Sequence, residues 1–277
     1  MSTATRSATV LFDTPGPRAR ARYRLFGVLS LLGIAGLLWY AYASLADAGQ
    51  FDGQLWDTFQ YKAVQQRILD GAVATLKAFA LAGVLSIVLG TLLATGRLSD
   101  HRPVRAVCTS VIEFFRAMPL LIMIFALYRG AFASQPMWAL VLGLTLYNGA
   151  VQAEVIRAGI AAVPRGQGEA AYALGLRKTQ VMGLILVPQA VRSMLPAIIG
   201  QLVVTLKDTS LGFVITYPEL LYAGKVIASN SPGYPYIPMI MVIGPIYIGL
   251  CLALTALAKW LEARSRRGAN RRTPVAA

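Results

Sequence analysis

A small set of polar side chains interrupts the long apolar segments of this chain. Asn148 and Gln152 are one helical turn apart, and Glu154 and Arg157 have the i, i+3 spacing at which opposite charges meet on one helix face. A second group interrupts a later apolar segment: Lys207, Asp208 and Thr209. Because charged groups are costly in hydrocarbon, we expect all of them to face the interior of a helix bundle. There they either line a path for a polar solute or hold the bundle together by pairing, and the sequence leaves both open.

The other residues and motifs that could support catalysis are scarce in this sequence. The only histidine, His101, lies in a short basic loop. Cys108 and Cys251 lie far apart in apolar surroundings, without the spacing of a metal site or a disulfide framework. We find no P-loop sequence. We therefore expect no catalytic residue, no metal and no cofactor, and the chain is not predicted to be an enzyme.

Another charged stretch, 163–188, lies between apolar segments rather than inside one. Pro164 and Gly166 favour a turn, and the next residues favour a short helix with Glu169 in its first turn, where the helix macrodipole stabilises an acid. Gly175 suits the left-handed conformation that ends such a helix. We expect a second short helix over 176–187 and a new element from Pro188. This stretch is predicted to be exposed at one face of the protein.

Composition indicates the surroundings of these residues. The chain has 277 residues, of which 56% are hydrophobic and 14% charged, and its mean hydropathy is +0.59. The charged fraction lies well below the ~25% of soluble domains, so a polytopic membrane protein in the lipid bilayer is predicted. The net charge is +14, but the basic residues gather in the tails and short loops between apolar segments. This is the pattern of membrane topology signals rather than of nucleic-acid binding.

Six apolar segments predict six transmembrane helices and an all-α fold. A basic tail (1–24) precedes an extra first helix (25–46), and further spans are expected over 71–96, 107–128, 136–161, 188–217 and 236–259, before a basic tail (264–277). In the third span, Glu113 and Arg116 are expected to pair and Pro119 to kink the helix. The fifth span is interrupted at 207–210, as a broken helix lining a cavity would be. A short helix is predicted over 218–229.

The distribution of basic residues predicts the orientation. Eighteen of the 26 Lys and Arg residues fall in segments that share one side with the two termini, and four fall on the other side. The positive-inside rule therefore places both termini in the cytoplasm, together with the stretch 163–188.

That stretch also carries a family resemblance. It contains Glu169-Ala170-Ala171, then Gly175, Ile185 and Pro188, with Val187 where leucine is usual. This resembles the signature of permease subunits of ATP-binding-cassette importers. Three further strings resemble polar amino-acid permeases: EFFRAMPLL (113–121), LYNGAVQAEVIRAGIAAVPRGQGEAA (146–171) and KDTSL (207–211). The first helix and the string VLFDTPGPRARAR (10–22) resemble the D-type permeases of glutamate uptake systems in actinobacteria.

The resemblance covers about 71–263 and implies a five-helix type I importer core behind the extra helix, in the cytoplasmic membrane of a bacterium. It implies two copies of a partner ATPase, a sister permease or a second copy of this chain, and an extracytoplasmic amino-acid-binding protein. ATP hydrolysis would belong to the partner ATPase. A short cytoplasmic coupling helix would transmit its closure through the residues Glu169, Ala170, Ala171, Tyr172, Leu174 and Gly175.

For an amino-acid substrate, the candidates for the pathway are Asn148, Gln152, Glu154, Lys207, Asp208 and Thr209. Lys207 could meet a carboxylate, and Glu154 or Asp208 an ammonium group. The alternative is that Glu113–Arg116, Glu154–Arg157 and Lys207–Asp208 are structural pairs. L-glutamate is the expected substrate, and glutamine, arginine, histidine and cystine remain open.

Two other classes fit the sequence less well. A secondary amino-acid transporter would need ion-coupling residues and usually inverted repeats, and we find no such pair of halves. A membrane scaffold would leave both the stretch 163–188 and the Lys207 group unexplained.

Overall fold

The computed structural model describes residues 16–270, with side chains described for residues 16–260. In that range the chain is helical and contains no strand, as the all-α prediction requires. It forms two units, one up to Gly53 and one from Gln54, and they are described separately. Residues 1–15 of the predicted N-terminal tail and 271–277 of the predicted C-terminal tail lie outside the described residues.

The N-terminal unit contains one long helix, α1 (Pro17–Asp47). Pro17 occupies the first turn, where its missing N–H costs nothing, so the helix begins within the predicted basic tail and continues through the predicted span. At 31 residues α1 is about 46 Å long, enough to cross ~30 Å of hydrocarbon. None of its residues is buried, and its apolar side chains are exposed around the whole helix. Such a surface suits lipid contact.

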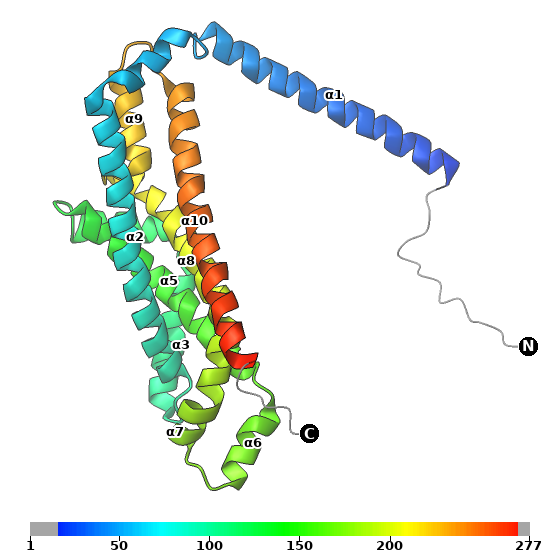
Figure 1. Ribbon diagram of the computed structural model, residues 1–277, viewed down its shortest axis with the longest axis vertical. Helices are drawn as coiled ribbons and strands as arrows, with labels where there is room; N and C mark the ends of the chain where they lie inside the picture. Colours follow the sequence, from blue (N-terminus) through cyan, green and yellow to red (C-terminus); the bar gives the residue numbers. More distant parts are fainter. Residues whose placement is uncertain (1–15, 271–277) are drawn as a thin grey trace, which may run out of the picture. The chain divides into compact units, whose positions relative to one another are not determined.

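The C-terminal unit is built around two long helices (Figure 1), α2 (Lys62–Arg97) and α5 (Pro136–Ala161). Small residues let their backbones approach closely. A Cβ atom added at Gly90 of α2 would lie 2.6 Å from the Cβ of Gln152 and 3.0 Å from the carbonyl oxygen of Gly149 in α5. The main apolar cluster lies between these helices and their neighbours and includes Ala78, Ala82, Ile124, Leu140, Leu144 and Ile215.

The third predicted span is a bent pair of helices rather than one kinked helix. α3 (Arg102–Ala117) and α4 (Leu120–Gly130) meet at 99°. Pro119 explains the break, because it disfavours the helical conformation at the preceding residue, and Met118 has an extended ψ of 128°. Counting this pair as one span, the described chain has up to six segments long and apolar enough to cross a membrane, as predicted.

The fifth span is one long run with three changes of helix type. It comprises α7 (Lys178–Gln180), the π-helix η3 (Val181–Leu186), α8 (Val187–Asp208) and the 3₁₀-helix η4 (Thr209–Ile215). The new element predicted at Pro188 is α8, which begins at Val187 with Pro188 in its first turn, where a residue without an N–H costs no hydrogen bond. The predicted interruption after Lys207 is present, as the change from α8 to η4.

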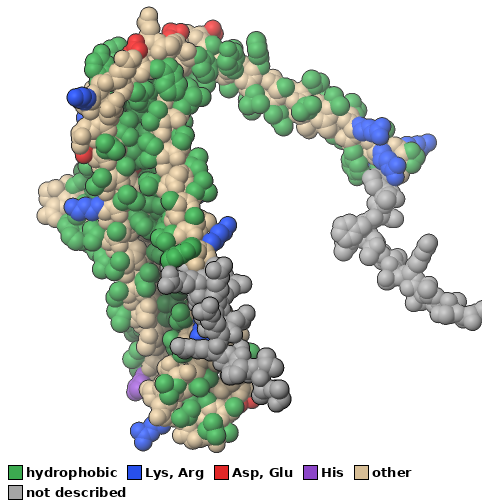
Figure 2. Space-filling model, in the orientation of Figure 1, with side chains coloured by type: hydrophobic (Ala, Val, Ile, Leu, Met, Phe, Trp, Pro, Cys, Tyr) green, Lys and Arg blue, Asp and Glu red, His purple; other side chains and the backbone are tan. Residues whose placement is uncertain are grey.

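The remaining helices complete the unit: η2 (Gly53–Gln60), α6 (Arg165–Ala173), α9 (Leu220–Asn230) and α10 (Tyr236–Asn270). The short helix predicted over 218–229 is α9. Helices α6 and α7 lie at one end of the unit, together with the C-terminal end of α10, and α9 lies toward the other end (Figure 1). Hydrophobic side chains are spread along the visible surface of the helices (Figure 2).

Candidate functional site

The exposed helix predicted in the stretch 163–188 is α6. Gly175 ends its turn with φ +77°, and its N–H donates to the carbonyl oxygen of Tyr172 at 2.9 Å, as expected for a left-handed cap. The helix begins at Arg165, earlier than predicted, because Pro164 already supplies its N-cap. Glu169 therefore lies in the second turn and not in the first, so the macrodipole argument for that residue is wrong.

The predicted coupling residues divide into one inward and five outward positions. Ala171 is buried against the protein, whereas the side chains of Tyr172 and Leu174 are 52% and 82% exposed. The other exposed members of the set are Glu169, Ala170 and Gly175. A short helix that presents a leucine and a tyrosine outward beside a carboxylate has the surface of a docking element.

An ion pair fixes the segment after α6 to the rest of the unit. The Lys178 ammonium group pairs with the Asp100 carboxylate and donates to the carbonyl oxygen of Leu98 at 3.2 Å. This hydrogen bond from Lys178 lowers the pKa of Asp100 below its usual value. We call the contact among these three residues the strap, because it joins the start of α7 to the loop that follows α2.

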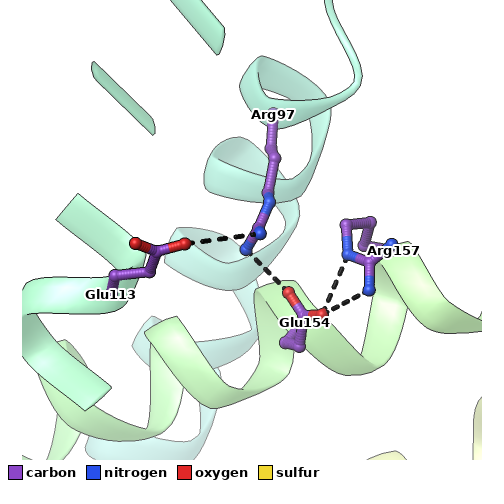
Figure 3. Close-up of polar contacts among 4 residues, drawn as sticks. All are labelled: Arg97, Glu113, Glu154 and Arg157. Carbon is purple, nitrogen blue, oxygen red and sulfur yellow. Dashed lines mark hydrogen bonds and ion pairs between the residues drawn. The ribbon is translucent and has the colours of Figure 1, made fainter. Parts of the chain in front are cut away.

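Four charged residues form a second cluster at the end of α2 (Figure 3). Arg97 donates to Glu154 at 2.7 Å, and the guanidinium group of Arg157 contacts the other oxygen of Glu154 at 2.5 and 2.9 Å. Glu113 lies 3.7 Å from Arg97. The predicted Glu154–Arg157 pair is therefore present. Glu154 is shared by two arginines, so both of its oxygens are already engaged.

The predicted Glu113–Arg116 pair is absent from the described ion pairs. Arg97 reaches Glu113 from α2 instead, so the fold places a cation of another helix closer than the one on the same helix. The side chain of Glu113 is 64% exposed. No ion pair joins Lys207 to Asp208 among the described side chains either; Lys207 is exposed and Asp208 half-buried.

A cluster of amides lies between α5 and α8. Gln201 donates to the side-chain oxygen of Asn148 at 2.7 Å, and Asn148 donates to the carbonyl oxygen of Leu144 at 3.0 Å. Gln152 donates to the carbonyl oxygen of Ile198 at 3.4 Å, and its own side-chain oxygen has no hydrogen-bond partner among the described residues. Asn148 and Gln152 are thus brought together as predicted, and both are buried. The sequence reasoning missed Gln201, a polar residue in the middle of the fifth span.

Thr209 belongs to another polar cluster, which the sequence reasoning also missed. Its hydroxyl lies 3.1 Å from the hydroxyl of Tyr247, which in turn donates to the Glu219 carboxylate at 3.2 Å. Glu219 is fully buried and caps α9, accepting from the N–H groups of Leu221 and Tyr222 at 2.8 and 2.7 Å. Burial raises the pKa of Glu219, which lies between two spans, to about 7.

The fold is that of a polytopic helical membrane protein, with the exposed short helix α6 at one end and buried amides between its helices. The chain belongs to the family described as the binding-protein-dependent transport system inner membrane component, whose model matches residues 86–267. The expectation that it is an importer permease is thereby confirmed, as is its place in a membrane.

Relatives with assigned roles agree with this family. The chain is 42% identical to the glutamate transport system permease protein GluD of Corynebacterium glutamicum, over 84% of this chain and 87% of that one. It is 32% identical to the arginine transport system permease protein ArtQ of Bacillus subtilis, over 70% of this chain and 90% of that one. A solved structure of an amino acid ABC transporter with histidines matches with a TM-score of 0.67 and 31% identity, covering 72% of this chain and 94% of that chain. The predicted type I importer fold is confirmed.

Proposed function

We propose that this chain is the permease subunit of an ATP-driven, binding-protein-dependent importer of polar amino acids, with L-glutamate as its substrate. The 42% identity to a glutamate transport permease over most of both chains supports the choice of substrate. ATP is hydrolysed by two copies of a partner ATPase, and an extracytoplasmic binding protein delivers the amino acid. The second permease of the complex is another copy of this chain or a sister permease.

The observation that carries the mechanism is the exposed surface of α6. A subunit without a P-loop must receive the closure of the ATPase mechanically, through an element that the ATPase can grip. The outward side chains of Tyr172 and Leu174 suit an apolar pocket of that partner, and Glu169 suits a basic residue. The strap then connects α7 to the loop after α2, so a movement of α6 also moves the core helices.

The orientation supports this arrangement. The C-terminal end of α10 and α6 lie at the same end of the unit (Figure 1), and the basic C-terminal residues and the basic loops favour the cytoplasm for that end. The C-terminus is therefore cytoplasmic, and α6 is within reach of a cytoplasmic ATPase. The six predicted spans and the basic N-terminal tail put the N-terminus on the same side.

For the substrate pathway we propose the amide cluster, together with Lys207 and Asp208. Gln152 offers a buried oxygen without a described donor, which suits an ammonium group, and the exposed Lys207 suits a carboxylate. Glu154 and Thr209 are engaged in contacts within the protein, so we assign them to holding the bundle together.

Uptake of labelled glutamate by the reconstituted complex tests the proposal. Unlabelled glutamate should compete fully, and glutamine, arginine, histidine and cystine should each compete at least tenfold more weakly. Lys207→Ala should raise the half-saturating glutamate concentration while the complex still assembles. Uptake that persists without ATP but follows an ion gradient would instead indicate a secondary transporter, and failure to assemble in the Lys207 variant would make that residue structural.

A further inference from the structure

A large cavity lies beside the strap and has no part in the proposed transport path. It has a volume of about 610 Å³, is partly open to the surface and is bordered by the last turns of α2, the end of α5 and the run from α7 to α8. Pockets that hold small ligands typically measure about 300–1,000 Å³. The cavity wall includes Ala94, Ile156, Ile160, Met182 and Met194. A space of this size and lining suits a hydrocarbon chain.

The polar residues of this cavity gather in one place. Ser99, Asp100, His101 and Lys178 line it near the loop that follows α2, whereas the residues from the transmembrane parts of the helices are mostly apolar. This lining suits an amphipathic occupant, with its polar group beside the strap and its apolar part along the helices.

The charges around the polar end of the cavity favour the binding of an anion. Lys178 donates to the carbonyl oxygen of Leu98 as well as pairing with Asp100, and Arg105 donates to the carbonyl oxygen of Ser99 at 3.2 Å. Two permanent cations and one imidazole thus face one carboxylate. In the orientation proposed above, on which this inference rests, this group lies where the hydrocarbon meets the cytoplasm, next to the headgroups of the inner leaflet.

We propose that the cavity binds an anionic phospholipid of the cytoplasmic leaflet, with one acyl chain inside and the phosphate beside Lys178 and Arg105. Basic pockets between membrane helices on the cytoplasmic side attract such headgroups, at about 1 kcal/mol for each Lys or Arg. The phosphate competes with Asp100 for Lys178. Binding therefore acts on the strap, which joins the coupling segment to α2, and it makes the response to the ATPase depend on the lipid.

Lipid retention by the purified full-length chain tests the proposal without any transport measurement. In a neutral detergent, the chain should retain phosphatidylglycerol at least fivefold more strongly than phosphatidylcholine with the same acyl chains, measured by native mass spectrometry. Lys178→Gln should weaken phosphatidylglycerol retention about fivefold, the factor that corresponds to about 1 kcal/mol. Asp100→Asn should strengthen it, because it frees Lys178 for the phosphate.

Lys178→Gln and Asp100→Asn distinguish a lipid site from a purely structural ion pair. A lipid site predicts opposite effects of the two changes on lipid retention, whereas a structural pair is broken equally by either change. Gly183 provides a test of the apolar part, since it lines the cavity and a Cβ atom there meets nothing within 4 Å. Gly183→Leu should reduce retention of both lipids, whereas Gly166→Leu, at an equally open glycine in α6, should not.

Three results would overturn the proposal: equal retention of the two lipids by the unaltered chain, weaker retention in both Lys178→Gln and Asp100→Asn, or unchanged retention in Gly183→Leu. Displacement of phosphatidylglycerol by glycerol phosphate alone would also overturn it, in favour of a site for a soluble anion. Because retention is measured without ATP or amino acid, each of these results is distinguishable from a failure of the proposed transport function.

Discussion

Glu219→Ala should destabilise the C-terminal unit by about 2–4 kcal/mol. The carboxylate accepts hydrogen bonds from two N–H groups at the start of α9, at 2.8 and 2.7 Å, and one from Tyr247 at 3.2 Å. Loss of an N-cap costs about 0.5–2 kcal/mol, and loss of a hydrogen bond to a charged group about 1.5–3 kcal/mol. The contributions overlap, so the sum is smaller than these figures added. For a unit of this size the melting temperature should fall by about 4–16 °C.

The same carboxylate should make stability depend on pH. Burial raises its pKa to about 7 in the folded protein, against a value of about 4.3 in the unfolded chain. The folded state therefore binds the proton more tightly than the unfolded chain does. Stability should fall as the pH rises from about 4 to about 7 and change little above that, by up to about 4 kcal/mol in total. Glu219→Gln, which cannot titrate, should remove this part of the dependence.

Thermal unfolding of the purified chain in detergent, followed at pH 5 and at pH 8, measures both effects. Glu113→Ala is the matched control, because that side chain is 64% exposed and makes one contact at 3.7 Å, so its removal should cost about 0.5 kcal/mol or less. If Glu219→Ala melted within about 2 °C of the unaltered chain, or if Glu219→Gln kept the full pH dependence, the account of this buried carboxylate would be wrong.

Three further predictions follow from contacts described above. Gly175→Val should lower ATP-driven uptake at least tenfold with the complex still assembled, because a β-branched residue is strained at φ +77°. Gly166→Val is the control and should not lower uptake in this way. Equal loss of uptake in both variants would count against a specific role for the left-handed cap at Gly175. A double-mutant cycle between Arg97→Ala and Glu154→Ala should give a coupling energy of about 1–2 kcal/mol in unfolding; additive effects would contradict the 2.7 Å pair. Gly90→Leu should destabilise the unit by about 1–3 kcal/mol or more by separating α2 from α5; an unchanged melting temperature would contradict their close approach.

The parts of the structure that sequence could predict are those set by local chemistry. Gly175 predicted the left-handed end of α6, and the run of polar residues after Leu206 predicted where α8 ends. The pair Glu154–Arg157 followed from spacing on one helix. In each case the residues that determine the feature lie within four positions of one another in the sequence, so the periodicity of a helix is sufficient to predict their contact.

The contacts that sequence reasoning missed are those made across the bundle. Glu113 is nearer to Arg97 than to Arg116 because α2 and α3 pack together, and no periodicity within α3 contains that information. The partner of Asn148 is Gln201, 53 residues away, and the partner of Glu219 is Tyr247, 28 residues away on α10. Glu219 lies within the short helix predicted over 218–229 and was not singled out, because only the packing of α9 shows that it is buried.

The run from Lys178 to Ile215 connects these distant contacts. It meets the loop after α2 through the strap, α5 through Gln201, and α10 through Thr209. Its 38 residues span about 57 Å if wholly α-helical, and the α geometry changes to a π-helix near one end and to a 3₁₀-helix near the other. Both changes interrupt the regular hydrogen-bond ladder, and Pro196 inside α8 removes a further hydrogen bond, so the run has three places at which it can bend. If α6 receives the closure of an ATPase as proposed above, the amide cluster at Gln201 is nearer to it along this run than Thr209 is, so the two polar clusters need not respond together.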